Sequence, residues 1–374
     1  MIKLNLIQAE FGDCFILQYG SETNPRYILI DGGPDKIFKN HLQSELSKIS
    51  ERGGKLDIAI LSHVDNDHLV GVLDLLAEME KQDANNLPRI IKIDTIWHNT
   101  FDKTIGEGND IKNRVNGVFA VGGAAARATM LSTNSVLTGI AEGDKLRSLA
   151  ERLEIPVNSG FEDKLVSLDT SPSSPVNLEN SNLRITIVGP TKANLEKLRQ
   201  EWLDWLAENE NLAGTQDPYT LAMVDRSIPN LSSIMILVEA DGKRALLTGD
   251  GRGDHLIEGL GQAGLLDGSG KIHVDLLKLP HHGSDKNVTK GFFETITADT
   301  YVISANGRYG NPDTSTLIWI VETAKKSARR VKIVLTNHTS SVEKLLDDYD
   351  PLEYGYEIIT MQRNSSNMTI ELAQ

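Results

Sequence analysis

Apolar segments of strand length recur along this chain, and each ends abruptly in a polar, glycine-rich loop. The segment Arg26–Ile30 is followed by Asp31-Gly32-Gly33, and Leu56–Leu61 runs directly into a loop with two histidines and two aspartates. The same succession returns at three further loops, which cover 248–250, 280–284 and 305–312. Because loops at one edge of a rigid sheet are where sites are usually built, this repetition constrains both the fold and the position of a site.

Helical patterns separate the early strands. Apolar residues at helical spacing predict helices over about 37–50 and 69–79. In the last third, Ser233–Glu239 and Lys243–Leu247 flank Ala240-Asp241-Gly242, which is a strong hairpin signal. Strands that alternate with helices predict an α/β fold built in layers.

The middle of the chain interrupts this pattern. From about 98 to 182 the β pattern disappears, and after a strand at 183–188 a second interruption runs over 192–228. We interpret the chain as a single domain over 1–374 that carries these two segments as helical insertions. The insertions are candidate surfaces for a protein partner or for self-association.

Composition excludes several classes of protein. The chain of 374 residues contains no stretch of 18 apolar residues, so no transmembrane helix is expected. Its first residues lack the pattern of a signal peptide, and the one cysteine, Cys14, excludes a disulfide framework and a cysteine-built zinc site. The net charge of −14 argues against a broad surface for nucleic acid or anionic membrane. We therefore expect a soluble cytoplasmic protein.

The densest group of chemically active side chains is His63-Val64-Asp65-Asn66-Asp67-His68, at the end of a strand. Imidazole and carboxylate ligands packed into six residues suit Zn, Mn or Fe, which accept mixed nitrogen and oxygen ligands. The alternative is that Asp65 or Asp67 caps the following helix and that the two histidines are incidental.

Two later loops add ligands of the same kind. Asp250 follows an apolar strand, although a single aspartate there is more often a turn or cap residue. His281 and His282 follow Pro280 at another strand end, and adjacent histidines are costly to bury without partners, although a solvated loop explains them equally well. Taken together with the first loop, these residues predict a site for one or two divalent metal ions, with Zn or Mn expected.

The order of these motifs resembles that of the metallo-β-lactamase superfamily. The likeness rests on Asp31-Gly32-Gly33, the loop from His63 to His68, Thr248-Gly249-Asp250 and the loop from His281 to Ser284. More narrowly, the chain resembles the hydrolase domain of the ComEC competence proteins, with which it also shares Glu10-Phe11-Gly12-Asp13 and Asn306-Gly307-Arg308-Tyr309-Gly310. The resemblance covers residues 1–97 and about 183–340, and it implies a four-layer αββα sandwich.

The resemblance also implies a ligand set. In the superfamily the third position of the first motif is usually His, whereas this chain has Asp65, as is common in the ComEC-like branch. The resemblance implies that His63, Asp65 and His281 hold one metal ion. It implies that Asp67 and His68 belong to a second ion.

Further roles follow by the same likeness. Asp250 would bridge the two ions, and Asp31 would be a carboxylate that fixes the histidine loop. The branch often carries a histidine, as the last ligand of the second ion, at the position of Asn311. An amide oxygen is a weaker ligand than an imidazole, so the sequence leaves open whether one ion or two are held.

The implied activity is metal-assisted hydrolysis, with a phosphodiester or nucleotide as substrate. A bound divalent ion lowers the pKa of water toward about 7, and Asp67 would orient that water. Arg308 or Lys286 would neutralise charge on a phosphodiester, although each is equally well explained as a solvated surface cation. His282 would support a ligand or contact the substrate. The sequence thus predicts a phosphodiesterase or nuclease.

Two other functions remain open at this stage. The superfamily also hosts hydrolases of non-phosphate esters, lactones and amides, and the fold alone does not choose among them. A regulatory, partner-binding protein with a degenerate metal site is favoured by Asn311 and by the two insertions. The acidic composition does not exclude a phosphate substrate, because bound cations offset the carboxylates of the site. It excludes only long, non-specific binding along a duplex.

Overall fold

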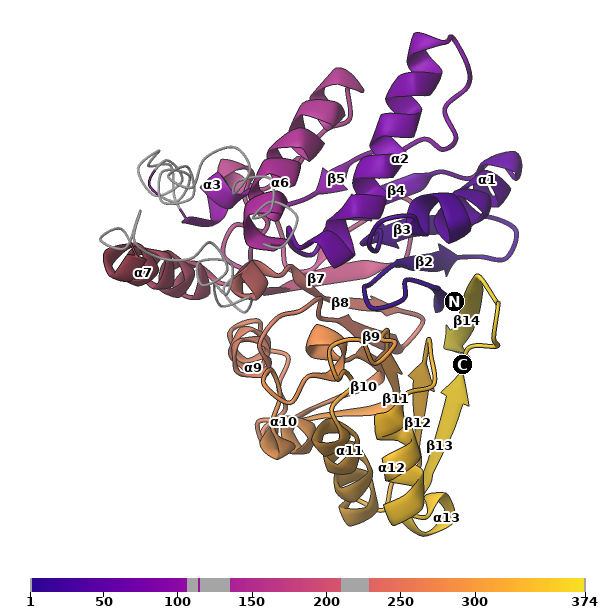
Figure 1. Ribbon diagram of the computed structural model, residues 1–374, viewed down its shortest axis with the longest axis vertical. Helices are drawn as coiled ribbons and strands as arrows, with labels where there is room; N and C mark the ends of the chain where they lie inside the picture. The colour runs from indigo at the N-terminus through magenta and orange to yellow at the C-terminus, as the bar shows by residue number, and fades with distance from the viewer. Residues whose placement is uncertain (1, 106–113, 115–134, 210–228, 373–374) are drawn as a thin grey trace.

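Two mixed β-sheets lie face to face, with helices on their outer sides (Figure 1). This arrangement comes from a computed structural model, which describes residues 2–105, 114, 135–209 and 229–372. The prediction of an α/β fold is confirmed, because strands and helices alternate along most of the described chain.

The first sheet has six strands in the order β14-β1-β2-β3-β4-β5. Their bounds are β1 (Ile2–Ile7), β2 (Phe15–Gly20), β3 (Pro25–Ile30), β4 (Leu56–Ile60), β5 (Ile96–Trp97) and β14 (Asn367–Leu372). β1 pairs antiparallel with both β2 and β14, whereas β3 and β4 are parallel. The last strand therefore closes the sheet beside the first, and the two ends of the chain lie side by side (Figure 1).

The second sheet has eight strands in the order β13-β12-β11-β10-β9-β8-β7-β6. Their bounds are β6 (Val176–Asn177), β7 (Arg184–Gly189), β8 (Met235–Ala240), β9 (Lys243–Leu247), β10 (Ile272–Lys278), β11 (Ile296–Ile303), β12 (Val331–Leu335) and β13 (Tyr356–Thr360). β8 and β9 form the predicted hairpin. The strands from β9 to β13 are parallel, so their carboxyl ends share one edge of the sheet.

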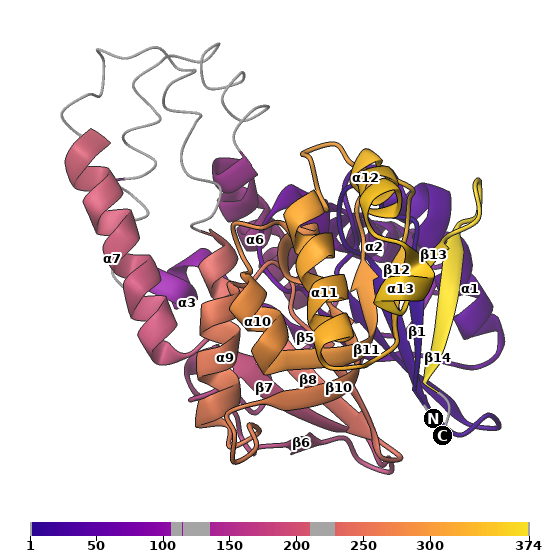
Figure 2. The same cartoon turned by 90° about the horizontal axis from the view of Figure 1, so that it is seen from below.

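Helices cover the outer face of each sheet. Those over the first sheet are α1 (Gln43–Glu51), α2 (Asn66–Ala84) and α6 (Ser135–Arg152). Those over the second are α9 (Gly253–Gln262), α10 (Lys290–Thr295), α11 (Thr314–Lys326) and α12 (Ser340–Asp348), with the short α13 (Pro351–Tyr354) beside them. α3 (Phe101–Ile105) and α7 (Lys192–Asn209) lie at one side of the molecule (Figure 2).

The core is divided into three layers by the two sheets. Between the sheets, apolar side chains of both meet, among them Leu4 and Ile58 from the first sheet and Val238 and Val302 from the second. Each outer layer joins one sheet to its helices. Alternate residues of the early strands are thus buried on both faces, which explains why these strands read as nearly continuous apolar runs.

The predicted insertions are described only in part. α3 and α6 lie within 98–182 and α7 within 192–228, while 106–113, 115–134 and 210–228 lie outside the described residues. α6 packs on α2, and its buried Leu146, Leu149 and Leu153 belong to the outer core of the first sheet. The segment 98–182 also contains the short strand β6, which pairs antiparallel with β7.

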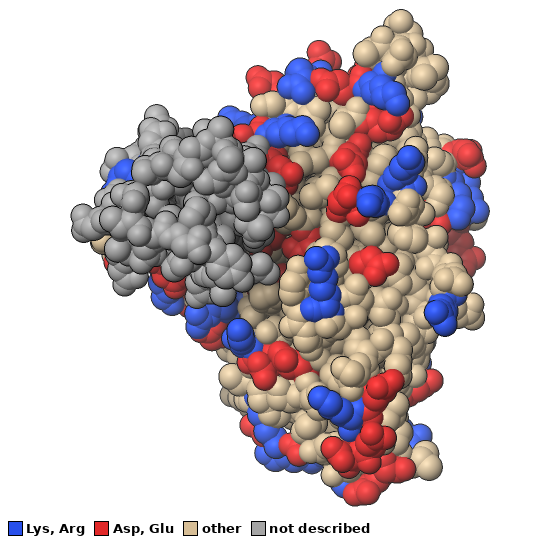
Figure 3. Space-filling model, in the orientation of Figure 1, with Lys and Arg blue, Asp and Glu red and all other residues tan. Residues whose placement is uncertain are grey.

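No helix among the described residues is long and apolar enough to cross a membrane. On the face shown in Figure 3, acidic and basic side chains are interspersed, and its described part carries no continuous basic strip. Such a strip is what a protein uses to follow the phosphates of a duplex.

A contact between two glycines fixes the start of α2. Gly71 in α2 lies so close to the loop after β3 that a Cβ there would come within 1.9 Å of the carbonyl oxygen of Gly32. The same contact carries hydrogen bonds, from Gly32 N to the carbonyl of His68 at 2.7 Å and from Gly71 N to that of Gly33 at 3.0 Å. The loop after β3 and the first turn of α2 therefore form one unit.

We expect Gly71→Ala to lower the free energy of unfolding by about 1–3 kcal/mol or more, because the added methyl has no room. Gly261→Ala is the matched control, since Gly261 is also helical but a Cβ there meets only Leu266, at 3.6 Å. It should stabilise the protein by up to about 1 kcal/mol through helix propensity. Urea unfolding of both variants measures this, and equal effects of the two would contradict the close contact.

Candidate metal centre

The candidate site lies where loops from the two sheets meet. The loop after β4 carries His63, Asp65, Asp67 and His68 into the start of α2. From the second sheet, Asp250 follows β9, and His281 and His282 follow β10 in a short turn, Pro280–Gly283. Parallel pairing of β9 with β10 brings the last two loops together, and packing of the sheets brings them against the first. The structure therefore unites residues from three loops that are far apart in sequence.

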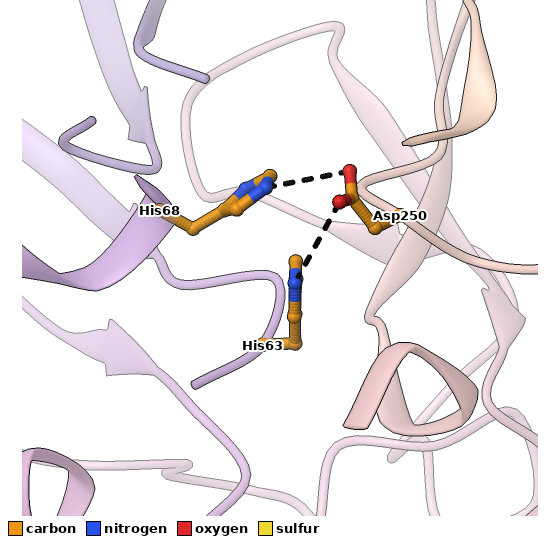
Figure 4. A group of neighbouring side chains, drawn as sticks. All are labelled: His63, His68 and Asp250. Carbon is orange, nitrogen blue, oxygen red and sulfur yellow. Dashed lines mark ion pairs between the residues drawn. The ribbon is translucent and has the colours of Figure 1, made fainter. Parts of the chain in front are cut away.

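Asp250 is at the centre of this group. Its carboxyl oxygens lie 3.9 Å from His63 Nε2, 3.3 Å from His68 Nε2, 3.8 Å from His281 Nε2 and 3.4 Å from His282 Nε2. Figure 4 shows His63, His68 and Asp250 pointing toward one another from their separate elements. Asp250 is 2% exposed, so one buried carboxylate faces four imidazoles.

The outer nitrogen of each imidazole is already engaged. His63 Nδ1 lies 3.0 Å from Ser62 Oγ, and His68 Nδ1 lies 2.8 Å from Asp31 Oδ2. His281 Nδ1 lies 2.8 Å from Asn287 Oδ1, and His282 Nδ1 lies 2.8 Å from the carbonyl oxygen of Ser304. A carboxylate or a carbonyl oxygen can only accept, so Nδ1 of His68 and of His282 carries the hydrogen. In the neutral ring, Nε2 is then a lone pair aimed at Asp250.

Several inward atoms lack a hydrogen-bond partner within the described part of the chain. They are His63 Nε2, His68 Nε2, His282 Nε2, Asp65 Oδ1 and Asp250 Oδ1. Buried polar atoms are nearly always paired, so a group of unpaired ones that face each other calls for a cation or protons between them. Imidazole nitrogen and carboxylate oxygen are the donors that Zn and similar divalent ions take. The residues therefore fit a metal ion.

The remaining carboxylates of the first loop extend this group in two directions. Asp65 Oδ2 lies 3.7 Å from His63 Nε2, and Asp67 Oδ2 lies 3.5 Å from His282 Nε2. Asp65 begins α2, but its side chain makes no capping hydrogen bond. The alternative interpretation, in which the Asp65 side chain caps the helix, therefore does not apply to Asp65.

The paired-histidine turn has an unusual backbone. His281 has φ of 46° and His282 has φ of 55°, both in the left-handed region, and Gly283 follows with φ of 84°. Such conformations are costly for residues with a Cβ and persist where surrounding contacts hold them. Here the left-handed backbone allows two adjacent histidines to direct their rings toward Asp250.

Asp31 fixes the loop from His63 to His68 through hydrogen bonds. Its two oxygens accept hydrogen bonds from the backbone nitrogen and from the hydroxyl of Ser62, each at 2.7 Å, and from His68 Nδ1. The predicted position of Asp31 against the histidine loop is confirmed. Its own φ of 58° places it in the left-handed region, which aspartate tolerates better than most residues.

Two residues of the centre were not predicted. Lys278, 1% exposed at the end of β10, forms an ion pair with Asp13, donates to the carbonyl oxygen of Gly249 at 2.8 Å and lies 3.6 Å from Asp250. Asp13 lies 3.4 Å from Nδ1 of His282. From sequence alone, a lysine near a strand end is expected to be exposed to solvent. Asp13 is distinguished in the sequence only by its place in Glu10-Phe11-Gly12-Asp13.

Charges within the centre shift one another's pKa values. Burial alone would raise the pKa of Asp250, but His282, His68 and His281 outweigh burial and hold it well below its ordinary value. Burial likewise opposes the charged form of His68, yet the carboxylates, Asp250 first, raise the pKa of His68 well above its ordinary value. The pKa of Asp67 falls to about 2 despite burial, because of His68 and His282. Without metal, these shifts favour ionised Asp67 and Asp250 beside protonated His68 and His282.

The other predicted site residues lie at the edge of this group. Asn311 is half-buried, and its Nδ2 donates to the carbonyl oxygen of His281 at 3.3 Å. Arg308 is exposed, and its guanidinium lies over the ring of Phe11. The predicted roles of Asn311 as a ligand and of Arg308 toward phosphate stay predictions. The sequence predicts a supporting or substrate-contacting role for His282, whereas its Nε2 faces Asp250 directly.

Comparison of the sequence with known protein families and with curated proteins finds no match. The candidate centre therefore rests on the geometry of the chain itself.

We expect Asp250→Asn to weaken binding of Zn or Mn by more than about 100-fold, since even groups that only support a ligand are worth about 10- to 100-fold. The change keeps the shape of the side chain but removes the charge that faces four imidazoles. Isothermal titration of metal-free protein measures the affinity. Asp254→Asn, an exposed aspartate in the first turn of α9, is the matched control. Wild-type affinity in Asp250→Asn would contradict a metal centre here.

His98 gives the metal-free protein an acid-sensitive stability. It is 1% exposed, and burial, with a smaller effect of Arg147, lowers its pKa to about 4. Its contribution is complete above the unfolded pKa of 6.5 and is lost as the pH falls toward 4, because only the unfolded chain takes up the proton in that range.

We expect His98→Gln to lose less stability than wild type between pH 7 and pH 4.5, by about 2–3 kcal/mol. Urea unfolding of metal-free protein at several pH values measures the difference. The exposed His338→Gln should follow wild type, and an unchanged pH dependence in His98→Gln would refute the assignment.

Proposed function

We propose that the chain is a metal-dependent phosphodiesterase or nuclease with the fold of the metallo-β-lactamase superfamily. One observation carries the proposal, namely that four histidines direct Nε2 onto one buried carboxylate while their Nδ1 atoms are held from outside. Two face-to-face sheets covered by helices support the αββα sandwich that the sequence motifs predict. A cytoplasmic location is part of the proposal and agrees with the single, buried Cys14.

In this proposal His63, Asp65 and His281 would hold one divalent ion, and Asp67, His68 and His282 would hold a second. Asp250 would serve both groups, because it faces all four described histidines of the centre. We assign His282 to the second ion because it lies against both Asp67 and Asp250. Asn311 is then next to the site, beside the backbone of His281.

A divalent ion bound there would lower the pKa of a coordinated water toward about 7 and stabilise charge on the phosphoryl oxygens. Asp67 remains ionised over the whole range in which such a protein works, because its pKa is about 2. Asp67 would therefore accept a hydrogen bond from the water used in hydrolysis and orient the lone pair of that water. Lys278 and Asp13 keep His282 in place from behind.

The test is hydrolysis by metal-free protein to which Zn or Mn is returned. We expect bis(p-nitrophenyl) phosphate to be cleaved, chelator to abolish cleavage, and added metal to restore it. Asp67→Asn should lower kcat by about 100- to 10,000-fold, the usual range for a group that handles the proton of the nucleophile. Asp74→Asn, two turns further along α2 and half-buried, is the matched control.

The substrate panel also includes a lactone and p-nitrophenyl acetate. Metal-dependent turnover of one of these, without turnover of any phosphodiester, would replace the proposal with the non-phosphate hydrolase. Absence of turnover together with less than about one tightly held metal ion per chain would favour the regulatory protein.

A further inference from the structure

A stack of two aromatic rings and one guanidinium stands beside the centre. The guanidinium carbon of Arg308 lies 4.4 Å from the ring centroid of Phe11 and 5.4 Å from that of Tyr309. The two rings meet edge to face, with centroids 5.8 Å apart. Tyr309 is 58% exposed and Arg308 is also exposed, so the stack is accessible from solvent.

The stack is attached directly to the candidate metal centre. On one side, Phe11 precedes Gly12, where a Cβ would lie 2.0 Å from the carbonyl oxygen of Asp67, and Asp13 N donates to that same oxygen at 3.1 Å. On the other side, the loop to Arg308 leaves Ser304, whose carbonyl oxygen holds Nδ1 of His282. Both segments that build the stack are thus fixed by contacts to residues of the centre.

The two segments are also tied to each other. Ser304 Oγ donates to the carbonyl oxygen of Gly12 at 2.5 Å, and Asn306 Nδ2 donates to Glu10 Oε2 at 3.0 Å. Asn306 Oδ1 accepts from the backbone nitrogen of Arg308 at 3.0 Å, which shapes the turn before the stack. Hydrogen bonds therefore fix the two segments that carry the stack relative to each other.

Its cation differs from others that lie over rings in this protein. Arg26 lies over Tyr19 but is paired with Asp57 at 2.9 Å, and Lys325 lies over Tyr354 but is paired with Glu353 at 2.6 Å. Among the described residues, no carboxylate lies within ion-pair distance of Arg308. A guanidinium that lies against two rings, with no carboxylate of the described chain paired to it, is available to an anion.

These properties match an unpaired nucleobase joined to a phosphate. Bases stack on exposed aromatic rings and on guanidinium planes, and a guanidinium also pairs with phosphate. A base inside a duplex has no free face to offer, and this acidic chain does not favour a long duplex either.

We propose that Phe11, Arg308 and Tyr309 form a subsite that stacks an unpaired nucleobase of the substrate, with Arg308 on its phosphate. The inference rests on the proposed phosphodiesterase function and narrows its substrate class to nucleotides and single-stranded nucleic acid.

The experiment compares two ligands of equal length and charge on the metal-loaded full chain. One is a phosphorothioate-linked tetramer of deoxythymidine, which resists cleavage, and the other is the same tetramer without bases. We expect the first to bind at least about fivefold more tightly by isothermal titration, the lower end of what one stacked base contributes. Thymidine 5′-monophosphate in a third arm tells a nucleotide site from one that needs a strand.

Variants separate the subsite from a structural role. Tyr309→Ala should reduce the preference for bases to less than about twofold, and Tyr309→Phe should keep it, because the ring is what stacks. Arg308→Gln should weaken both tetramers. Tyr354→Ala removes a ring with its own cation on α13, at the opposite end of the second sheet from this loop, and should match wild type.

Each failure has its own signature. Equal binding of both tetramers, binding of neither, or an unchanged preference in Tyr309→Ala would overturn the subsite even in a chain that cleaves bis(p-nitrophenyl) phosphate. A preference for bases that Tyr309→Ala abolishes would support the subsite even if no phosphodiester were cleaved, in which case the proposed hydrolysis alone would fail.

Discussion

The buried carboxylate of Asp250 is the charge around which the rest of the centre is arranged. Removing an ionised carboxylate from water costs several kcal/mol unless opposite charge or hydrogen bonds replace the water. The four imidazoles that face it come in equal numbers from the two sheets. The candidate site can therefore form only when the sheets are packed together, so the apolar core between them is a condition for the site as well as for the fold.

The charged residues of the centre are numerous, and their charges can be counted against one another. Asp13, Asp31, Asp65, Asp67 and Asp250 are all close to its histidines, and Lys278 is the one lysine that reaches them in the described chain. Counted as carboxylates, the five aspartates leave four negative charges after Lys278 is counted, and two divalent ions would balance these charges. The pKa values of His68 and His282 are raised by the carboxylates around them, so metal binding at these rings would be linked to proton release.

The sequence predicts the strands, the hairpin and the main site residues because all of these are local signals. Each site residue comes directly after an apolar strand, and a strand end is visible in the order of residues. The pairing of β14 with β1 and the packing of α6 on α2 depend on contacts between distant segments, which no local pattern encodes. Lys278 escapes prediction for a related reason, since its burial depends on Asp13, far away in sequence.

The balance of charge also changes what an acidic composition means. The net charge of −14 belongs to the whole chain, and on the face shown in Figure 3 the described acidic and basic side chains are interspersed. Salt screens such surface charges from one another beyond about 10 Å. A phosphate near the centre responds instead to the few groups around it. If two divalent ions replace the histidine protons, the buried carboxylates are neutralised and Arg308, at the rim, is left with its charge unpaired within the described chain. Local positive potential would then attract an anion despite the acidic composition, which agrees with the proposed preference for a short or single-stranded substrate.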